Sequence, residues 1–128
     1  LLSVSVCVPD SRLVRVLSET VGATQPTAVV GDVDFVRAAE LSRGVRAIID
    51  MAYTAACIKI SKIVNFLDQV AAVTTVRYVV EYVITEYGIA NLKYRTVRDR
   101  ARMLIDIAHP SFHDSLKEEF EKRFKAKF

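Results

Sequence analysis

The residues YVITEYGIANL at positions 82–92, followed by TVRDRARMLIDIAHPSF at positions 96–112, contain the change of periodicity that decides the fold. The first stretch overlaps the end of residues 70–84, which are rich in Val, Ile, Thr and Tyr and so favour a strand. The second repeats apolar residues at helical spacing. Its apolar face is formed by Val97, Ala101, Leu104, Ile105 and Ala108. We therefore predict a strand, a turn and a helix in this order.

Local signals set the ends of this helix and start another. Thr96 and Asp99 have capping-box spacing, in which a hydroxyl accepts from a backbone amide and a carboxylate reaches back. Pro110 disfavours helical geometry at His109 and suits the first turn of a second helix, which we expect to run to the end of the chain. Its apolar stripe needs a surface to pack on. The stripe consists of Phe112, Leu116, Phe120, Phe124 and Phe128.

Upstream of these helices most segments have strand character. Residues 2–8 alternate apolar and small polar side chains. The other expected strands are residues 12–17, 28–30, 45–49, 58–64 and 70–84. Asp34 can cap a short helix through Leu41, and Gly44 suits the left-handed position after it. The sequence thus predicts an α/β fold: a mixed sheet with one internal helix and two C-terminal helices. It does not determine the order of the strands.

Length and composition narrow the class of protein. With 128 residues, 52% of them hydrophobic, the chain is expected to form a single domain over residues 1–128. The longest stretch without a charge, Thr20 to Gly31, is shorter than the ~18 residues that a membrane-spanning helix needs. Cys7 and Cys57 have no C-x-x-C spacing, which indicates buried thiols in a reducing compartment. We expect the cytoplasm, or the mitochondrial matrix in a eukaryote.

The start of the chain has two features that bear on its origin. Leu1 to Val8 lacks a basic region and a cleavage site, so we do not expect a secretory signal. The chain also lacks an initiating Met. We expect it to be a part of a longer protein, a processed product or an engineered fragment.

The net charge of +3 arises entirely after residue 76. A row of basic residues there could face phosphate or nucleic acid, but it wraps around the helix, so a solvated surface is favoured. This row is Lys93, Arg95, Arg98, Arg100 and Arg102. Arg95/Asp99 and Arg102/Asp106 have the four-residue spacing of helical ion pairs. We therefore expect no nucleic-acid partner and no membrane partner.

Two further motifs have both a plain and a functional interpretation. His109 and His113 are four residues apart, but no thiolate lies nearby and structural zinc takes four ligands, so no metal is expected. Gly31 lies between an expected strand and an expected helix, where a backbone amide can approach an anion or an acyl oxygen. By itself Gly31 indicates no more than a turn.

The two stretches quoted first resemble the C-terminal domain of the acetyl-CoA hydrolase/transferase family, which includes acetate, succinate and 4-hydroxybutyrate CoA-transferases. The family reads V-V-T-E-Y-G-V-A-x-L and then R-x-R-A-x-x-L-I-x-I-A-H-P-x-F. The resemblance continues upstream at residues 31–35, 41–44, 48–55, 59–64 and 73–77. It therefore covers nearly the whole chain.

This resemblance implies the α/β fold of the CoA-transferase superfamily, with coenzyme A as a substrate and no covalently bound cofactor. A glutamate attacks an acyl-CoA, and a glutamyl-CoA thioester then passes CoA to a second carboxylate or to water. Gly31 matches the family glycine whose amide contributes to the oxyanion hole. Lys59 is the second candidate, as an electrostatic contact to CoA. The implied partners are acyl-CoA, small carboxylates and the remaining N-terminal domain. A homodimer through the Phe stripe is an open alternative.

The sequence departs from the family in two ways. The nucleophilic glutamate of the family lies in an E-x-G-x-G segment upstream of this chain, so the chain alone is expected to be inactive. Val30 and Asp32 replace a glycine and a glutamine of the family's G-G-Q, which should weaken backbone contacts to CoA. The alternative is therefore a non-catalytic homologue or scaffold that retains only the fold.

Overall fold

The computed structural model describes residues 32–50, 54–55, 60–66 and 75–128. Its elements, in chain order, are α1 (Asp32–Leu41), β1 (Ile48–Asp50), β2 (Thr54–Ala55), β3 (Ile60–Ser61), β4 (Tyr82–Thr85), β5 (Gly88–Asn91), α2 (Val97–Asp106), the 3-10 helix η2 (Pro110–Phe112) and α3 (His113–Phe124). The strands expected within residues 2–8, 12–17 and 28–30 lie outside the described residues.

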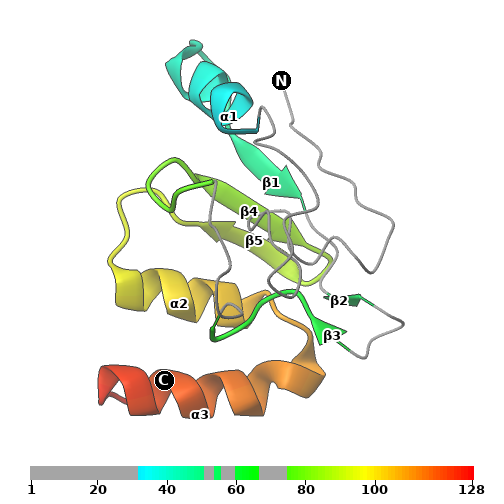
Figure 1. The fold of residues 1–128 in the computed structure, drawn as a ribbon, viewed down its shortest axis with the longest axis vertical. Coiled ribbons are helices and arrows are strands. Elements are labelled where there is room, and N and C mark those ends of the chain that lie inside the picture. Colours follow the sequence, from blue (N-terminus) through cyan, green and yellow to red (C-terminus); the bar gives the residue numbers. More distant parts are fainter. Residues whose placement is uncertain (1–31, 51–53, 56–59, 67–74) are drawn as a thin grey trace, which may run out of the picture.

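Within the described residues, the main sheet has three strands in the order β1-β4-β5. Strands β1 and β4 are parallel, with Ile49 opposite Val83, whereas β4 and β5 form an antiparallel hairpin. Strands β2 and β3 form a separate antiparallel pair. Figure 1 shows α1 beside the β1 edge, α2 beside β5, and α3 on the far side of α2. The predicted α/β class, with a mixed sheet, one internal helix and two C-terminal helices, is therefore confirmed.

The ends of the helices follow the chemistry of their caps. Thr96 is the N-cap of α2, and its hydroxyl accepts from the Asp99 amide at 3.1 Å and donates to the Asp99 carboxylate at 2.7 Å. Gly44 has φ +76° after α1, the left-handed conformation expected of it. Helix α1 begins at Asp32, two residues before the predicted cap at Asp34. Helix α3 ends at Phe124 and not at the chain end, because Lys125 is left-handed.

The strand expected over residues 70–84 is largely wrong in the part that the structure describes. A turn precedes β4, with the Val79 amide bonded to the Val76 carbonyl at 3.1 Å, and the strand begins only at Tyr82. The apolar run was interpreted as a strand because it is rich in β-branched residues. Val79 and Val80 are buried in the core, but they pack from an irregular segment.

Three apolar clusters hold the layers together. One joins α1 to the sheet through Val36, Ala39, Ala47 and Val79. A second lies between the sheet and α2 and consists of Val80, Val83, Ala90, Leu92 and Ile107. The third joins α2 to α3 through Ile105, Ala108, Leu116 and Phe120. The predicted Phe stripe thus packs inside the domain, whereas Val97, assigned to the buried face of α2, is half exposed.

Candidate functional site

The two predicted site residues, Gly31 and Lys59, lie outside the described residues. Their places in the sequence still relate them to described elements. Gly31 directly precedes Asp32, the first residue of α1, and Lys59 directly precedes Ile60, the first residue of β3. The roles of both residues therefore remain predictions.

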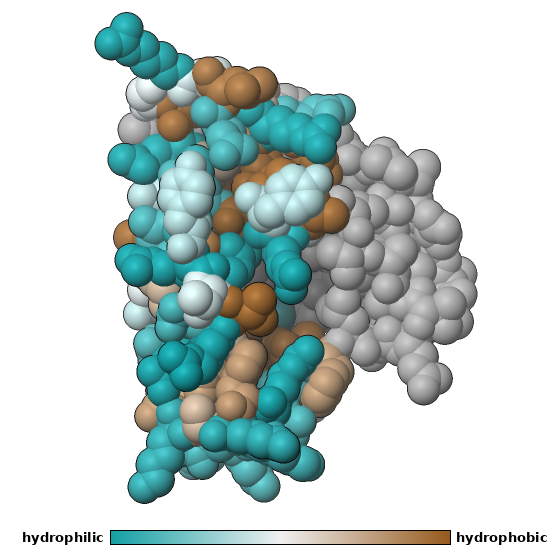
Figure 2. Space-filling view, turned by 90° about the vertical axis from the view of Figure 1, so that its left-hand side faces the viewer, coloured by the Kyte–Doolittle hydropathy of each residue, from teal (hydrophilic) through white to brown (hydrophobic). Residues whose placement is uncertain are grey.

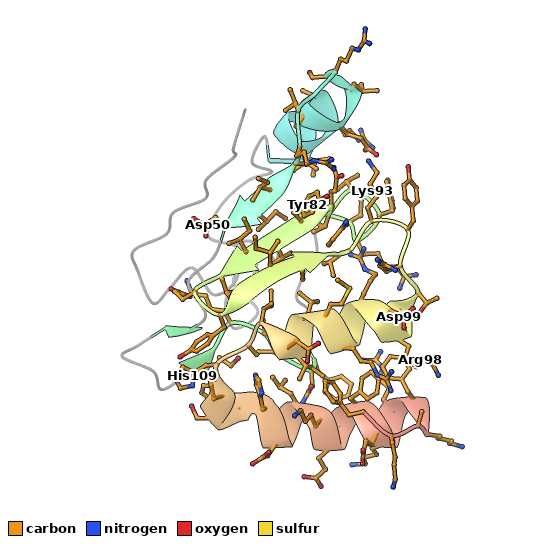
Figure 3. The ribbon with its side chains drawn as sticks, turned by 180° about the vertical axis from the view of Figure 1, so that it is seen from behind. Asp50, Tyr82, Lys93, Arg98, Asp99 and His109 are labelled. Atoms are coloured by element: carbon orange, nitrogen blue, oxygen red, sulfur yellow. The ribbon has the colours of Figure 1, made fainter. Side chains whose placement is uncertain are left out.

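The carboxyl ends of the parallel strands define one edge of the sheet. Strand β1 ends at Asp50 and β4 at Thr85, and the hairpin turn Glu86–Tyr87 follows at that edge. Ligands of open sheets with parallel strands bind outside these carboxyl ends. We call this edge, with the residues that follow each strand, the carboxyl edge. Figure 3 shows Asp50 and His109 at this end of the molecule, and the β2–β3 pair lies there too.

Thr85 fixes the hairpin turn to the end of α2. Its hydroxyl donates to the Ile107 carbonyl at 2.6 Å and accepts from the Tyr87 amide at 3.2 Å. The side chain is buried, so these bonds satisfy a hydroxyl that would otherwise be costly to bury. The Tyr87 ring meets the His109 ring edge-on, with centroids 5.5 Å apart. The turn and the end of α2 therefore form one braced unit at the carboxyl edge.

His109 serves as a helix cap. Its Nδ1 accepts from the Ser111 amide at 3.1 Å and also contacts the Ser111 hydroxyl, at the N-cap of η2. The Nε2 atom of His113 lies 3.0 Å from the Ala108 carbonyl. The two histidines thus contact groups around the α2–α3 junction. Within the described ranges, no group of three or more His, Cys, Asp or Glu side chains is arranged to hold a metal.

The opposite end of the sheet carries a network of charges. Lys93 Nζ lies 3.2 Å from Glu40 of α1 and 3.7 Å from Glu81, which also pairs with Arg46 at 3.4 Å. The hydrogen bond to Glu40 is the largest cause that raises the pKa of Lys93. Arg46 also donates to the Tyr82 hydroxyl at 2.9 Å. This network links α1 to β4 and β5 and has a structural role.

Two of the basic residues of the predicted row are structural. Arg100 donates to the Leu92 carbonyl at 2.6 Å and to the Arg77 carbonyl at 2.8 Å. Burial, together with the nearby Arg77, lowers the pKa of Arg100. Arg102 lies over the rings of Phe120 and Phe128, at 5.4 and 5.9 Å.

The expected ion pairs of α2 are wrong: among the described residues, neither Arg95/Asp99 nor Arg102/Asp106 is in contact as a salt bridge. The Asp99 carboxylate accepts from the hydroxyl of the N-cap Thr96, and Arg102 packs on aromatic rings instead. The four-residue spacing predicted ion pairs because it takes no account of the contacts that Asp99 and Arg102 make with other residues.

A search for a bilayer-spanning segment, made over the described residues, finds no helix with the necessary length and apolar character.

Comparison with known proteins relates this arrangement to one family. The profile of the acetyl-CoA hydrolase/transferase C-terminal domain matches residues 12–120. The chain is 51% identical over 124 residues to 4-hydroxybutyrate coenzyme A transferase of Clostridium kluyveri, covering 97% of this chain and 29% of that protein. It is 40% identical to succinyl-CoA:cyclohexane-1-carboxylate CoA transferase of Geobacter metallireducens, covering 91% and 27%. The chain therefore spans less than a third of the length of these relatives.

Solved structures show the same similarity. RipA from Yersinia pestis superposes with a TM-score of 0.67 at 36% identity, over 75% of this chain and 22% of that one. The 4-hydroxybutyrate CoA-transferase from Porphyromonas gingivalis gives a TM-score of 0.65 at 44% identity, over 73% and 23%.

Proposed function

Because this chain belongs to the acetyl-CoA hydrolase/transferase C-terminal domain family, we propose that it is the C-terminal part of a longer enzyme that moves CoA between two carboxylates. The observation that carries this proposal is the 51% identity, over 97% of the chain, to a protein named as a CoA-transferase. The partners that we propose are an acyl-CoA, a small carboxylate and the N-terminal remainder of the enzyme. In a hydrolase of this family, water takes the place of the acceptor carboxylate. The compartment that we propose is the cytoplasm, or the mitochondrial matrix in a eukaryote.

The reaction runs through a glutamate that lies outside this chain. Its carboxylate attacks the acyl-CoA carbonyl and expels the CoA thiolate, which leaves an acyl-glutamyl anhydride. The thiolate then attacks the glutamyl carbonyl, which releases the first carboxylate and forms a glutamyl-CoA thioester. A second carboxylate attacks this thioester and expels the thiolate, which leaves a second acyl-glutamyl anhydride. The thiolate then attacks the acyl carbonyl of this anhydride, forms the new acyl-CoA and releases the glutamate carboxylate. The glutamate is thereby regenerated.

In this proposal the chain supplies backbone and charge to the tetrahedral steps. The Gly31 amide donates to the developing oxyanion, and the start of α1 after it adds a favourable helix dipole. Lys59 is close in sequence to β3 of the β2–β3 pair and contacts a charged group of CoA.

A chimera tests the proposal. This chain replaces the corresponding C-terminal part of the Clostridium kluyveri relative, and the purified protein is mixed with an acyl-CoA without an acceptor. Mass spectrometry should then detect CoA attached as a thioester. Gly31→Ala should reduce turnover at least about tenfold, because one oxyanion donor is displaced. Gly44→Asn serves as the glycine control and should leave turnover within about twofold, since nothing lies within 4 Å of a Cβ there and asparagine tolerates the left-handed φ of +76°.

A second function has one observation in its favour. Val30 and Asp32 stand where the family motif has a glycine and a glutamine, while helix and core positions are retained. If the chain is a non-catalytic scaffold, the chimera folds but accumulates no CoA thioester and transfers no CoA. That result would overturn the proposed CoA transfer.

A further inference from the structure

Aromatic and apolar side chains are exposed at the end of the sheet opposite to the carboxyl edge. Tyr94 is 94% exposed and Tyr78 is 72% exposed. Leu41, at the end of α1, is 87% exposed, and the Lys93–Glu40 ion pair holds this end of α1 beside Lys93. We call the surface formed by Arg77, Tyr78, Lys93, Tyr94, Arg95 and Arg98 the amino-end face. Figure 2 views the molecule from this end, where paler and brown side chains lie among hydrophilic ones.

The backbone at Tyr94 is held in an unfavourable conformation. Tyr94 has φ +59°, which is uncommon for a bulky residue other than glycine. Hydrogen bonds on both sides fix it: the Lys93 amide bonds to Asn91 Oδ1 at 3.3 Å, and the Arg95 amide to the Leu92 carbonyl at 3.4 Å. Such a conformation costs free energy and persists only where the surrounding contacts impose it. The unfavourable backbone conformation of Tyr94 therefore coincides with an aromatic side chain that is exposed to solvent.

The amino-end face carries more positive than negative charge among the residues that the structure describes. Among the described residues, Arg77, Arg95 and Arg98 take part in no ion pair. The carboxylates of Glu40 and Glu81 are already engaged by Lys93 and Arg46. The N-terminus of α2 lies between Arg95 and Arg98, and its first turn carries one carboxylate, that of Asp99, against the three arginines. A partner for this surface should therefore carry carboxylates.

A second copy of this chain and a nucleic acid fit the amino-end face less well than a carboxylate-bearing partner. A twofold dimer through this face would place the same arginines opposite each other, which electrostatics disfavours. A nucleic acid would require a row of available cations, but Arg100 and Arg102 are directed inward to carbonyls and rings. The outer side of α3, by contrast, mixes Glu118, Glu119, Glu121 and Lys122 and resembles a solvated surface.

We propose that the amino-end face docks against a carboxylate-bearing surface of the upstream part of the same longer polypeptide, with Tyr94 inserted into it. The relatives have more than two thirds of their length outside the matched region, so a large body is available to cover this face. The inference rests on the proposed function only in taking the chain as one part of a longer enzyme. It assigns no role in catalysis to the docked residues.

Tyrosine nitration of the chimera described above tests the docking. Tyr94 is nitrated in the isolated chain and in the chimera, and the two rates are compared by peptide mass spectrometry. Burial at an interface core should slow the reaction at Tyr94 at least about tenfold in the chimera. The acetylation rate of Lys122, whose side chain is 77% exposed on α3, should not change and serves as the internal control.

A pair of charge-reversal variants of the chimera tests the electrostatic part. Arg95→Glu combined with Arg98→Glu should restore nitration of Tyr94 to near the rate of the isolated chain. Lys122→Glu combined with Lys127→Glu changes the charge equally on α3 and the C-terminal tail and should leave Tyr94 protected. Equal nitration of Tyr94 in the chain and the chimera, or equal effects of the two double variants, would overturn the proposal. CoA transfer is measured separately, so loss of activity with Tyr94 still protected counts against the proposed function alone.

Discussion

At the residue scale, Arg100 differs from its neighbours in the basic row. Sequence spacing placed it among solvated charges, yet its guanidinium bonds two carbonyls, of Leu92 after β5 and of Arg77 in the turn before β4. A guanidinium is suited to this because it presents several donors in a fixed plane. One side chain thus fixes the first turn of α2 to both ends of the β4–β5 hairpin.

Arg100→Met should lower the free energy of unfolding by about 2 kcal/mol, because it leaves two carbonyls without their charged donor. Urea unfolding followed by circular dichroism measures the change. Arg98→Met, an exposed arginine two residues earlier, is the control and should stay within about 0.5 kcal/mol of the wild type. Equal losses in the two variants would contradict the role given to Arg100.

At the element scale, local sequence signals were sufficient to predict where α2 begins and where the next helix starts. Thr96 caps the helix as its sequence predicted, and Pro110 begins the 3-10 helix that follows. Strand β5 was not predicted as a separate strand, although the two residues Glu86 and Tyr87 join it to β4 as a tight hairpin. A two-residue connection between strand-forming segments was the signal that could have revealed it.

Thr96→Ala should cost about 1 kcal/mol of unfolding free energy, because the Asp99 amide loses its side-chain acceptor. Thr96→Ser keeps the hydroxyl and should recover most of this loss. Thermal and urea unfolding of the two variants distinguish a cap from a packing effect of the methyl group. If serine is as destabilising as alanine, the cap is not the cause.

At the scale of the whole molecule, the C-terminal helices act as the support of the sheet. Phe120 is buried against α2, and its ring contacts Phe124 at 4.8 Å and Phe128 at 5.4 Å. Ile63, which follows β3, packs on this cluster and on the cluster beneath the sheet. The apolar clusters of the sheet and of the C-terminal helices therefore share a residue, and disruption of one cluster should destabilise the other.

Phe120→Ala should lower the unfolding free energy by about 3–5 kcal/mol, because it removes a large buried ring. The loss should appear in the same transition for the helices and for the sheet, followed by circular dichroism and by hydrogen exchange of β4 amides. Phe66→Ala removes a ring that is 64% exposed and should cost less than about 1 kcal/mol. Unfolding of α3 alone, with β4 still protected, would contradict this coupling.

The sequence by itself determined the presence of the helices, the Thr96 cap, the apolar Phe stripe that packs inside the domain, and the family. These depend on residues three or four positions apart, or on contiguous motifs, so a linear reading contains the information. For the candidate site it gave Gly31 and Lys59, which remain predictions because both lie outside the described residues.

Only the tertiary structure decided the parallel pairing of β1 with β4, the irregular path before Tyr82 and the inward direction of Arg100 and Arg102. It likewise decided that Tyr94 is exposed. Composition records that a side chain is apolar or charged, but its partner comes from a segment far away in the chain. Strand pairing and burial are set by those distant contacts, whose free energy exceeds that of local preference.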